Sequence, residues 1–278
     1  MADNNNKSVL ITGCSSGIGY CVALGLRERG YRVFASARKI QDVARLKAEG
    51  FECLMLDLDD RRGIDQAIDQ LLELNNNRLF ALFNNGAYGQ PGAVEDLPTE
   101  ALIAQFHTNL FGWHHLTRRL IPVMRRQGHG RIIQNSSVLG FTALCYRGAY
   151  SASKFALEGL TDTLRLELQG TGIHVSLIEP GPIESLFRTN SLEKWRLHID
   201  LENSPHREAY QAMKTRLEKP GPATPFTLPP EAVLKRVIHA LESPRPKARY
   251  YVTFPTYLFG TLKRLLPTAT LDRLLRRI

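Results

Sequence analysis

The sequence is poor in cysteine and has no long apolar run. None of its four cysteines forms a CxxC pair, and no histidine or cysteine cluster has the spacing of a metal site. These absences exclude a disulfide-stabilised scaffold and predict reduced thiols and no bound metal. No run of about 18 apolar residues is present, so no membrane-spanning helix is predicted. The polar opening "MADNNNKSVL" lacks the apolar stretch of a signal peptide, and we therefore expect a cytoplasmic protein.

Acidic residues are fewer than basic ones, and the formal net charge is +9. The excess is concentrated at one end, because residues 245–278 contain eight Lys/Arg and one acidic residue. No basic stripe and no nucleic-acid motif is found in the body of the chain. The charge therefore does not predict binding to nucleic acid.

The 278 residues are enough for one large domain with a substantial core, and we expect a single domain over residues 1–278. Short apolar runs alternate with segments of helical periodicity. This alternation predicts a doubly wound α/β fold, in which helices cover both faces of a parallel sheet. Strands are expected at 7–12, 31–36, 51–58, 78–84, 130–137 and 173–180, with helices at 18–29, 40–48, 60–75, 99–126 and 149–170.

The regular alternation ends at Pro182. Residues 183–230 are polar and irregular, and an irregular segment of this length within one domain predicts a functional lid. Beyond it we expect a helix at 231–242, a short strand near "RYYVTF" and a basic amphipathic segment at 256–278. The apolar residues of this last segment fit two alternatives, contact with anionic lipid or packing on the body of the protein, and the sequence favours packing.

The first strand is followed by "TGCSSGIG", which opens a helix. Glycines at this point allow a tight turn and let the backbone approach a pyrophosphate at the helix N-terminus. The motif therefore predicts a dinucleotide site after the first strand. The predicted contacts are Gly13, Ser15, Ser16, Gly17, Ile18 and Gly19.

The end of the second strand, "FASARK", indicates which dinucleotide binds. An NAD site usually has an acidic residue there, whereas this chain has Arg38 and Lys39. A guanidinium can form two hydrogen bonds to a 2′-phosphate, so NADP(H) is favoured as cofactor. The alternative interpretation is a solvated pair of charges at the start of a helix.

Two tyrosines stand four residues ahead of a lysine, Tyr150 with Lys154 and Tyr210 with Lys214. Such pairs share one face of a helix, but the spacing alone is common. Tyr150 begins the helix after the fifth strand, and that strand ends at Ser137. Because ligands bind beyond the carboxyl ends of parallel strands, Ser137 and Tyr150 are expected to face the same crevice. Tyr210 follows no such strand, and we predict no catalytic role for it.

The motifs "TGCSSGIG", "NNGA", "NSSVLG", "YSASK" and "EPGPIES", in this order, resemble the short-chain dehydrogenase/reductase family over roughly residues 7 to 185. The likeness is strongest to the branch of 17β-hydroxysteroid and retinol dehydrogenases, which includes bacterial NADP-dependent aldehyde reductases. The resemblance implies a Rossmann fold and hydride transfer between a nicotinamide and a lipophilic aldehyde, ketone or alcohol. It also implies a homodimer or homotetramer built through the helices at 99–126 and 149–170.

The resemblance further implies the role of each site residue. Tyr150 would transfer a proton to or from the substrate oxygen, Ser137 would hydrogen-bond that oxygen, and Lys154 would lower the pKa of the tyrosine toward neutrality and hold the nicotinamide ribose. Asn109 would support a water in a proton relay. The further cofactor contacts that it implies are Asp57 and Leu58 near the adenine, Asn85 and Gly86, and Pro180, Gly181, Ile183 and Ser185 near the nicotinamide.

One motif departs from the family pattern. The fourth strand of the family ends in Asn-Asn-Ala-Gly, whereas this chain has Asn84-Asn85-Gly86-Ala87. The swap places a Cβ where the backbone usually runs close to the cofactor, and altered cofactor affinity is expected. A rival hypothesis for the whole chain is a sensor or scaffold that binds NADP(H) without turnover. The joint presence of Asn109, Ser137, Tyr150 and Lys154 favours the enzyme.

Overall fold

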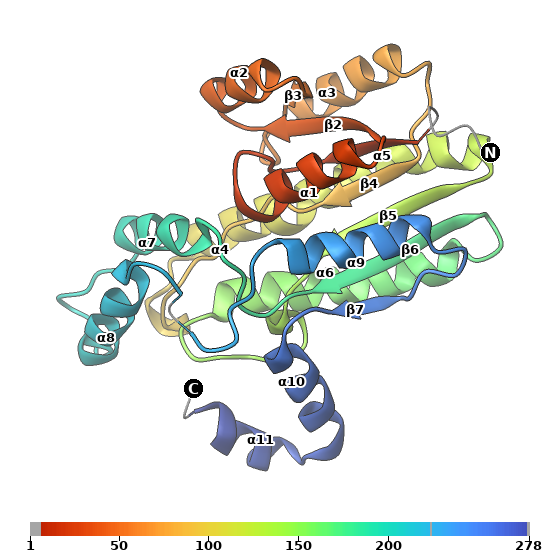
Figure 1. Ribbon diagram of the computed structural model, residues 1–278. Coiled ribbons are helices and arrows are strands. Elements are labelled where there is room, and N and C mark those ends of the chain that lie inside the picture. The colour runs from red at the N-terminus through yellow and green to blue at the C-terminus, as the bar shows by residue number, and fades with distance from the viewer. Residues whose placement is uncertain (1–6, 223, 277–278) are drawn as a thin grey trace.

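The computed structural model describes residues 7–222 and 224–276, and its centre is a parallel sheet of seven strands in the order β3-β2-β1-β4-β5-β6-β7 (Figure 1). The order reverses direction between β1 and β4, so the sheet has its switch point there. The predicted doubly wound parallel fold is therefore confirmed. The strands are β1 (Ser8–Ile11), β2 (Arg32–Ala37), β3 (Glu52–Met55), β4 (Ala81–Asn84), β5 (Gly130–Asn135), β6 (Ile173–Glu179) and β7 (Arg249–Tyr251).

Helices cover both faces of this sheet (Figure 1). Successive residues of a strand point to opposite faces. In β1, Val9 and Ile11 join the core beneath α1 (Gly17–Glu28), α2 (Ile40–Ala48) and α9 (Glu231–Glu242), whereas Leu10 joins the core on the other side. That second core is closed by α3 (Arg61–Leu74), α5 (Gly112–Gln127) and α6 (Gly148–Glu167). Both faces of the strands are buried, which explains their uniformly apolar sequences.

The single long helix expected at 99–126 is interrupted. It consists of α4 (Thr99–Phe106), a π-helical segment η3 (His107–Phe111) and α5. A π segment inserts one extra residue in a helical turn and often occurs at functional sites. Here it holds the buried Asn109 beside the carboxyl ends of the strands.

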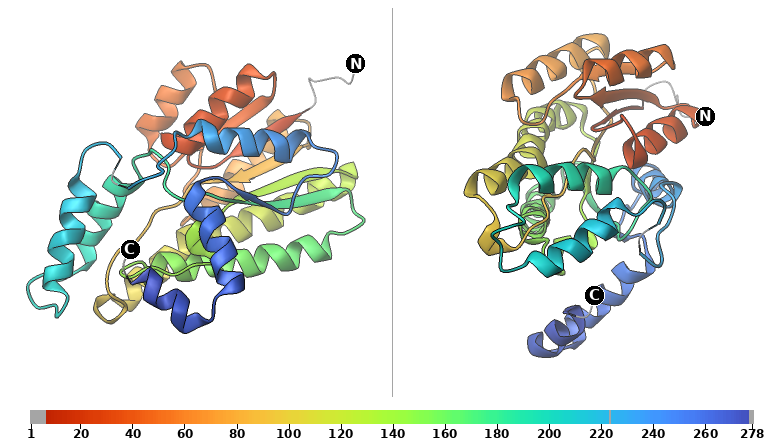
Figure 2. Two further views of the ribbon diagram at one scale, coloured as in Figure 1. Left: turned by 60° about the horizontal axis from the view of Figure 1, so that its bottom comes forward. Right: turned by 90° about the vertical axis from the view of Figure 1, so that its left-hand side faces the viewer.

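The segment predicted as a lid forms two helices, α7 (Phe187–His198) and α8 (Arg207–Glu218), which lie side by side at one end of the molecule (Figure 2). They share a small apolar core of their own, with Trp195 and Tyr210 at its centre. The first and last parts of the segment pair with each other through an isolated bridge between Ile183 and Leu228. The segment predicted as a lid is therefore an ordered helical pair whose two ends are held together.

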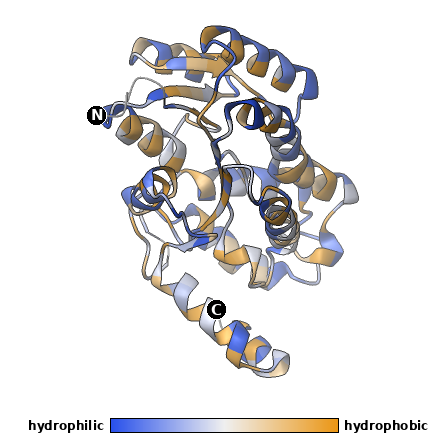
Figure 3. Ribbon diagram, turned by 90° about the vertical axis from the view of Figure 1, so that its right-hand side faces the viewer, coloured by the Kyte–Doolittle hydropathy of each residue, from blue (hydrophilic) through white to orange (hydrophobic). Residues whose placement is uncertain are grey.

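The two C-terminal helices, α10 (Phe254–Leu265) and α11 (Thr268–Leu275), project from the body (Figures 1 and 3). The expectation that this segment packs its leucines on the body is met only in part, because Leu262, Leu266, Leu271 and Leu275 are half-buried but none is fully buried. In α10 only Thr256 and Gly260 are buried, and α11 has no buried residue. Leu265 is 72% exposed, since the chain turns away at Leu266 before it reaches another apolar surface. No helix in the described residues is long and apolar enough to cross a membrane.

Candidate active site

The loop after β1 is shaped for close contact with a ligand. Gly13 has a φ of +69°, and a Cβ on it would lie 2.6 Å from the Cα of Gly86. A Cβ on Gly19 would lie 2.2 Å from the carbonyl oxygen of Gly13. Neither position has room for a side chain, so the loop presents backbone instead.

The N-terminus of α1 is open for a phosphate. Ser16 precedes the helix, its hydroxyl does not cap it, and the first turn contains no acidic residue. Free amide N–H groups at a helix start attract anions. Gly17 has a φ of +56° and lies against Ser185. A side chain at Gly17 would place its Cβ only 2.9 Å from the Cβ of Ser185. Ser15 and Ile18 flank this turn, which fits the pyrophosphate of a dinucleotide.

A network of side chains not singled out by the sequence holds this loop against β4 and β5. The Thr12 hydroxyl accepts hydrogen bonds from the backbone amides of Asn85 (2.8 Å) and Gly86 (2.9 Å). The Asn85 side chain donates to the Gly13 carbonyl (3.3 Å) and accepts from Asn135 (2.9 Å). Thr12 and Asn135 are missed because their importance depends on strands that are distant in the sequence. The only local signal is that each polar residue stands at the end of an apolar run.

The predicted adenine end lies at the carboxyl ends of β2 and β3. Arg38 and Lys39 follow β2 directly and are exposed, and among the described residues neither side chain forms a hydrogen bond or an ion pair. Leu58 is buried beside Gly86, at 3.5 Å from the position of a Cβ there. Asp57 accepts a hydrogen bond from the backbone amide of Asp59 (3.1 Å), so part of its role is to shape the turn.

The chain after β6 passes the same crevice. The carbonyl of Pro180 accepts a hydrogen bond from Val138 (2.8 Å), and Gly181 has no space for a side chain beside Thr253. The Ser185 hydroxyl accepts a hydrogen bond from the amide of Phe187 (3.3 Å). Of the four predicted residues of this segment, Ser185 lies against Gly17, whereas Pro180, Gly181 and Ile183 contact Val138, Thr253 and Leu228.

The structure brings Ser137, Tyr150 and Lys154 together beyond β5. Ser137 precedes the short helix η4 (Val138–Gly140), and its hydroxyl accepts a hydrogen bond from the amide of Leu139 (3.1 Å). It lies near enough to Tyr150, in the first turn of α6, to lower the pKa of that phenol. One turn later, the Lys154 ammonium donates to the carbonyl of Asn135 (2.7 Å) and lies 5.7 Å from the Tyr150 ring centroid. The position of the lysine is thereby fixed from the neighbouring strand.

Asn109 supports the same helix from the other side. Its amide donates to the carbonyl of Tyr88 (3.0 Å) and to the hydroxyl of Ser153 (3.3 Å), which in turn donates to the carbonyl of Tyr150 (2.8 Å). Asn109 is thus connected to the backbone at Tyr150 through protein groups. Its predicted role in holding a water remains a prediction.

Burial dominates the titration of both catalytic candidates. It raises the pKa of Tyr150 to about 12, although the hydrogen bond from Ser137 acts in the opposite direction. It lowers the pKa of Lys154 to about 7, against the attraction of Glu158, which raises it. The protein alone therefore keeps the tyrosine protonated at neutral pH, which is the form that donates a proton. The expected lowering of its pKa by Lys154 does not appear in the protein alone.

The second tyrosine pair forms no site. Tyr210 is completely buried in the lid core, where its hydroxyl donates to Asp96 and accepts from the amide of Ala93 (2.9 Å), whereas Lys214 is exposed. The two side chains therefore do not meet. Tyr210 holds the lid against the loop that contains Asp96.

The unusual Gly86-Ala87 pair also has a structural context. A Cβ on Gly86 would lie 3.3 Å from the nitrogen of Gly13, which requires a small movement of one of the two loops. Ala87 packs its methyl group against the apolar core below the sheet. The swap thus gives the glycine loop additional room, and its effect on cofactor affinity remains a prediction.

Comparison with known proteins agrees with this geometry. The family model of the short chain dehydrogenases matches residues 7–196, and the chain belongs to this family. It is 44% identical to the uncharacterized oxidoreductase YbbO of Escherichia coli, over 97% of this chain and 94% of that protein. Human 17-beta-hydroxysteroid dehydrogenase type 1 is 32% identical (88% and 77% covered), and the NADPH-dependent 3-dehydrocapnine reductase of Ornithobacterium rhinotracheale is 30% identical (96% and 95%). The predicted likeness to the hydroxysteroid and retinol dehydrogenase branch is confirmed.

Among solved structures, a short-chain dehydrogenase of Streptomyces avermitilis has a similar fold. It superposes with a TM-score of 0.78 at 26% identity, covering 95% of this chain and 94% of the other. The oxidoreductase class and the nicotinamide-binding fold of this protein follow from its family.

Proposed function

We propose that this protein is an NADP(H)-dependent oxidoreductase that interconverts a lipophilic aldehyde or ketone and the corresponding alcohol. The observation that carries the proposal is the meeting of Ser137, Tyr150 and Lys154 beyond β5, next to the glycine loop. A scaffold that only binds the cofactor needs the loop but not two neighbouring hydroxyls with a lysine beside them.

The chemistry follows from these three side chains. The protonated Tyr150 donates its phenolic proton to the carbonyl oxygen in reduction and takes it back in oxidation. Ser137 donates a hydrogen bond to the same oxygen and fixes its position. Lys154, held by the carbonyl of Asn135, would hold the nicotinamide ribose when the cofactor is bound, and its charged form would favour the phenolate. NADP(H), when bound, supplies or accepts the hydride, so that carbonyl, NADPH and one proton give alcohol and NADP⁺.

The preference for NADP(H) over NAD(H) rests on Arg38. Its side chain has no partner among the described residues and lies directly beyond β2, where the adenine ribose binds in this fold. A free guanidinium there stabilises the 2′-phosphate, and no carboxylate repels it. One relative is named as NADPH-dependent, which supports the same choice.

A lipophilic substrate is supported by the lid. The ring of Phe187, at the start of α7, lies edge-on against Tyr150 with 5.3 Å between ring centroids. The same ring packs on Gly89, where a side chain would place its Cβ only 2.8 Å from the ring of Phe187. A substrate that reaches the tyrosine must therefore pass an aromatic ring, which favours an apolar chain next to the carbonyl.

The proposal includes a homodimer or homotetramer formed through the outer faces of η3 and α6, where Phe111, Phe155, Leu160 and Leu166 are exposed. It also includes peripheral contact of the projecting α10 and α11 with a lipid surface.

A cytoplasmic location stays a prediction.

The first test is the loss of absorbance at 340 nm with NADPH or NADH and aldehydes of increasing chain length. We expect turnover with NADPH in preference to NADH, and rates that rise with chain length. Tyr150→Phe should reduce kcat at least about a hundredfold, because the proton donor is lost. Tyr210→Phe is the matched control and should retain turnover, since this tyrosine lies only in the lid core.

Tight NADPH binding without turnover of any aldehyde or ketone would overturn the enzyme proposal and favour the sensor. Turnover that survives Tyr150→Phe would overturn the assignment of the acid.

A further inference from the structure

Three arginines, two in the lid helices and one just before α6, lie close together without an acidic partner among the described residues. Arg147 lies just before α6, Arg188 is in α7, and Arg216 is in α8. All three are partly buried, and none forms an ion pair within residues 7–222 and 224–276. A partly buried guanidinium normally has a carboxylate beside it, because desolvation of an unpaired charge costs free energy.

The contacts of these arginines show how close they are. The Arg147 guanidinium lies 3.2 Å from the sulfur of Met213, which is three residues before Arg216 on the same face of α8. The Arg188 guanidinium donates to the carbonyl of Arg216 (3.1 Å). Burial lowers the pKa of Arg147 to about 10, and repulsion from Arg216 adds to this effect. The pKa of Arg216 is lowered as well, by burial and by Arg188.

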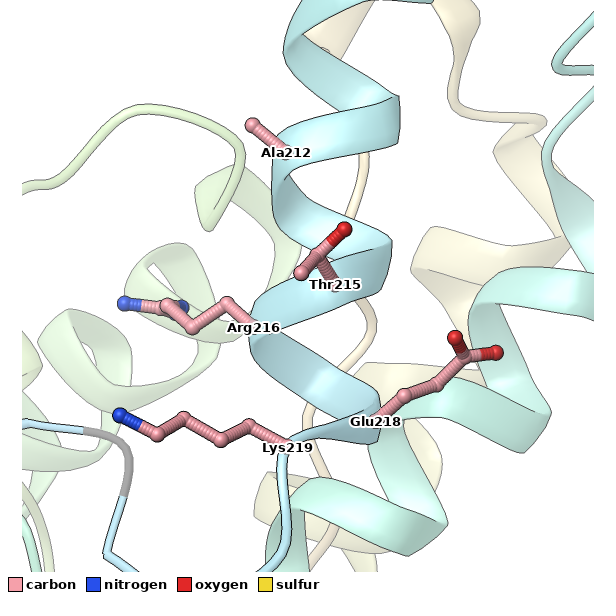
Figure 4. A pocket seen from close by; sticks show the side chains of 5 residues that line it. All are labelled: Ala212, Thr215, Arg216, Glu218 and Lys219. Atoms are coloured by element: carbon pink, nitrogen blue, oxygen red, sulfur yellow. The ribbon is translucent and has the colours of Figure 1, made fainter.

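The nearest acidic residue on α8 is turned away from this cluster. Figure 4 shows Arg216 and Lys219 extending from one side of α8 and Glu218 from the other, and all three belong to the lining of one pocket of about 510 Å³. Glu218 is engaged by Arg196 at 2.6 Å. The carboxylate of this pocket is therefore already paired, and Arg216 itself forms no ion pair among the described residues.

The cluster also lies beside the reacting groups. Arg147 is the residue immediately before α6, and its carbonyl accepts a hydrogen bond from the amide of Ser151 (2.8 Å), so its backbone lies within one turn of Tyr150. Arg188 directly follows Phe187, whose ring contacts Tyr150. The predicted adenine and pyrophosphate sites are at Arg38 and at the start of α1, so the cofactor phosphates have separate partners.

We propose that Arg147 and Arg216 form a subsite for an anionic group of the substrate, so that the carbonyl compound is an amphiphile with an apolar chain and a carboxylate or phosphate. Arg188 positions α8 through its bond to the Arg216 carbonyl. This inference rests on the proposed reductase function and adds the substrate class to it. The aromatic ring of Phe187 selects the chain, and the two guanidiniums select the charge.

The kinetic test compares a medium-chain aldehyde that carries a terminal carboxylate with its methyl ester, both with NADPH. We expect the wild-type protein to show a KM for the acid about tenfold or more below that of the ester, since a hydrogen bond to a charged group contributes substantially to binding. Arg147→Met and Arg216→Met should each raise the KM of the acid by a similar factor and leave the ester unchanged. Arg207→Met, an exposed arginine on the same helix, is the matched control and should change neither.

Binding gives a second readout that does not depend on turnover. Calorimetric titration with decanoate, decyl phosphate and decanol separates the two anions from the neutral chain and from each other. We expect both anions, or one of them, to bind more tightly than decanol to the wild type but not to Arg147→Met. Equal binding of anions and decanol, or equal losses for acid and ester in both variants, would overturn the subsite. Anion binding without turnover of any carbonyl would overturn the proposed function and leave the subsite intact.

Discussion

At the scale of single residues, burial shifts the two central titrating groups in opposite directions. Tyr150 gains a pKa of about 12 and Lys154 a pKa of about 7, because each neutral form is favoured when water is excluded. A phenol in this state carries its proton at neutral pH but is a weaker acid than an exposed tyrosine. In the direction of oxidation it depends on a nearby positive charge, which Lys154 and the oxidised cofactor provide.

The Lys154 pKa makes a prediction about stability. Its value in the folded protein lies below the ordinary 10.5, so the folded state carries the full penalty of a buried charge below about pH 7. The penalty decreases as the pH rises from about 7 to 10.5, where only the unfolded chain remains protonated. Lys154→Met should therefore raise Tm by several degrees at pH 6 and by clearly less at pH 9.5, while activity falls at least about a hundredfold. Thermal unfolding at the two pH values measures this, and an equal gain at both would contradict it.

The sequence identifies site residues where a local motif carries them. Gly13, Gly19, Ser137 and Tyr150 lie in short motifs whose chemistry depends on near neighbours in the chain. Arg147 is different. Its proposed role depends on its closeness to two arginines from other helices and on the lack of an ion pair for any of the three in the described residues. The spacing of residues in a sequence does not show whether an arginine has an acidic partner in the folded protein.

At the scale of elements, the sequence predicts the strands and the helices that cover the sheet. For the lid it predicts the position in the chain but not the two helices that form it. The apolar run of β4 or β6 is buried whatever else packs on it, so its pattern is sufficient. In α7 the apolar residues follow a weak pattern, since the helix packs on α8 and on the loop of Ala93 and not on the sheet. The π segment at Asn109 was also missed, because periodicity continues on both sides of the extra residue.

The lid helices make a prediction of their own. Tyr210→Phe removes the hydroxyl that links α8 to Asp96 and to the amide of Ala93, and it leaves that buried amide without a partner. We expect a loss of about 1–3 kcal/mol in the free energy of unfolding, with kcat changed less than twofold. Chemical denaturation measures the loss. Tyr257→Phe, which removes an exposed hydroxyl bonded to the carbonyl of Tyr251, is the control and should lose little.

At the scale of the whole molecule, positive charge and exposed apolar side chains coincide at one projection. The pair α10–α11 carries Lys263, Arg264, Arg273 and Arg276 against Asp272, and it exposes Phe254, Tyr257, Leu258, Leu265 and Leu274. A second copy of the same basic surface would repel it, whereas anionic lipid would attract it. The ring of Phe254 also contacts that of Phe226, in the segment predicted as a lid, with 4.9 Å between the ring centroids.

Co-sedimentation with vesicles tests this surface. We expect binding to vesicles that contain phosphatidylglycerol and not to pure phosphatidylcholine. The double variant Arg264→Gln/Arg273→Gln should bind at least about tenfold more weakly, given about 1 kcal/mol for each basic residue near a charged membrane. Arg125→Gln/Arg126→Gln removes the same charge from the end of α5 and should bind like the wild type. Equal binding to both lipids would show that charge has no part in it.

Residues 185–187 lie between the predicted nucleotide site and Tyr150, and this position bears on the order in which the two substrates bind. Ser185 lies beside the turn at Gly17, where a phosphate is predicted to bind, and its hydroxyl accepts the amide hydrogen of Phe187, whose ring lies edge-on against Tyr150. A nucleotide that draws on this hydroxyl loosens the residue that blocks the reactive phenol. We therefore expect a compulsory order of arrival, nucleotide first and carbonyl compound second. We expect such a protein to have the reduced nucleotide already bound, so that its rate of turnover depends on the concentration of the carbonyl compound.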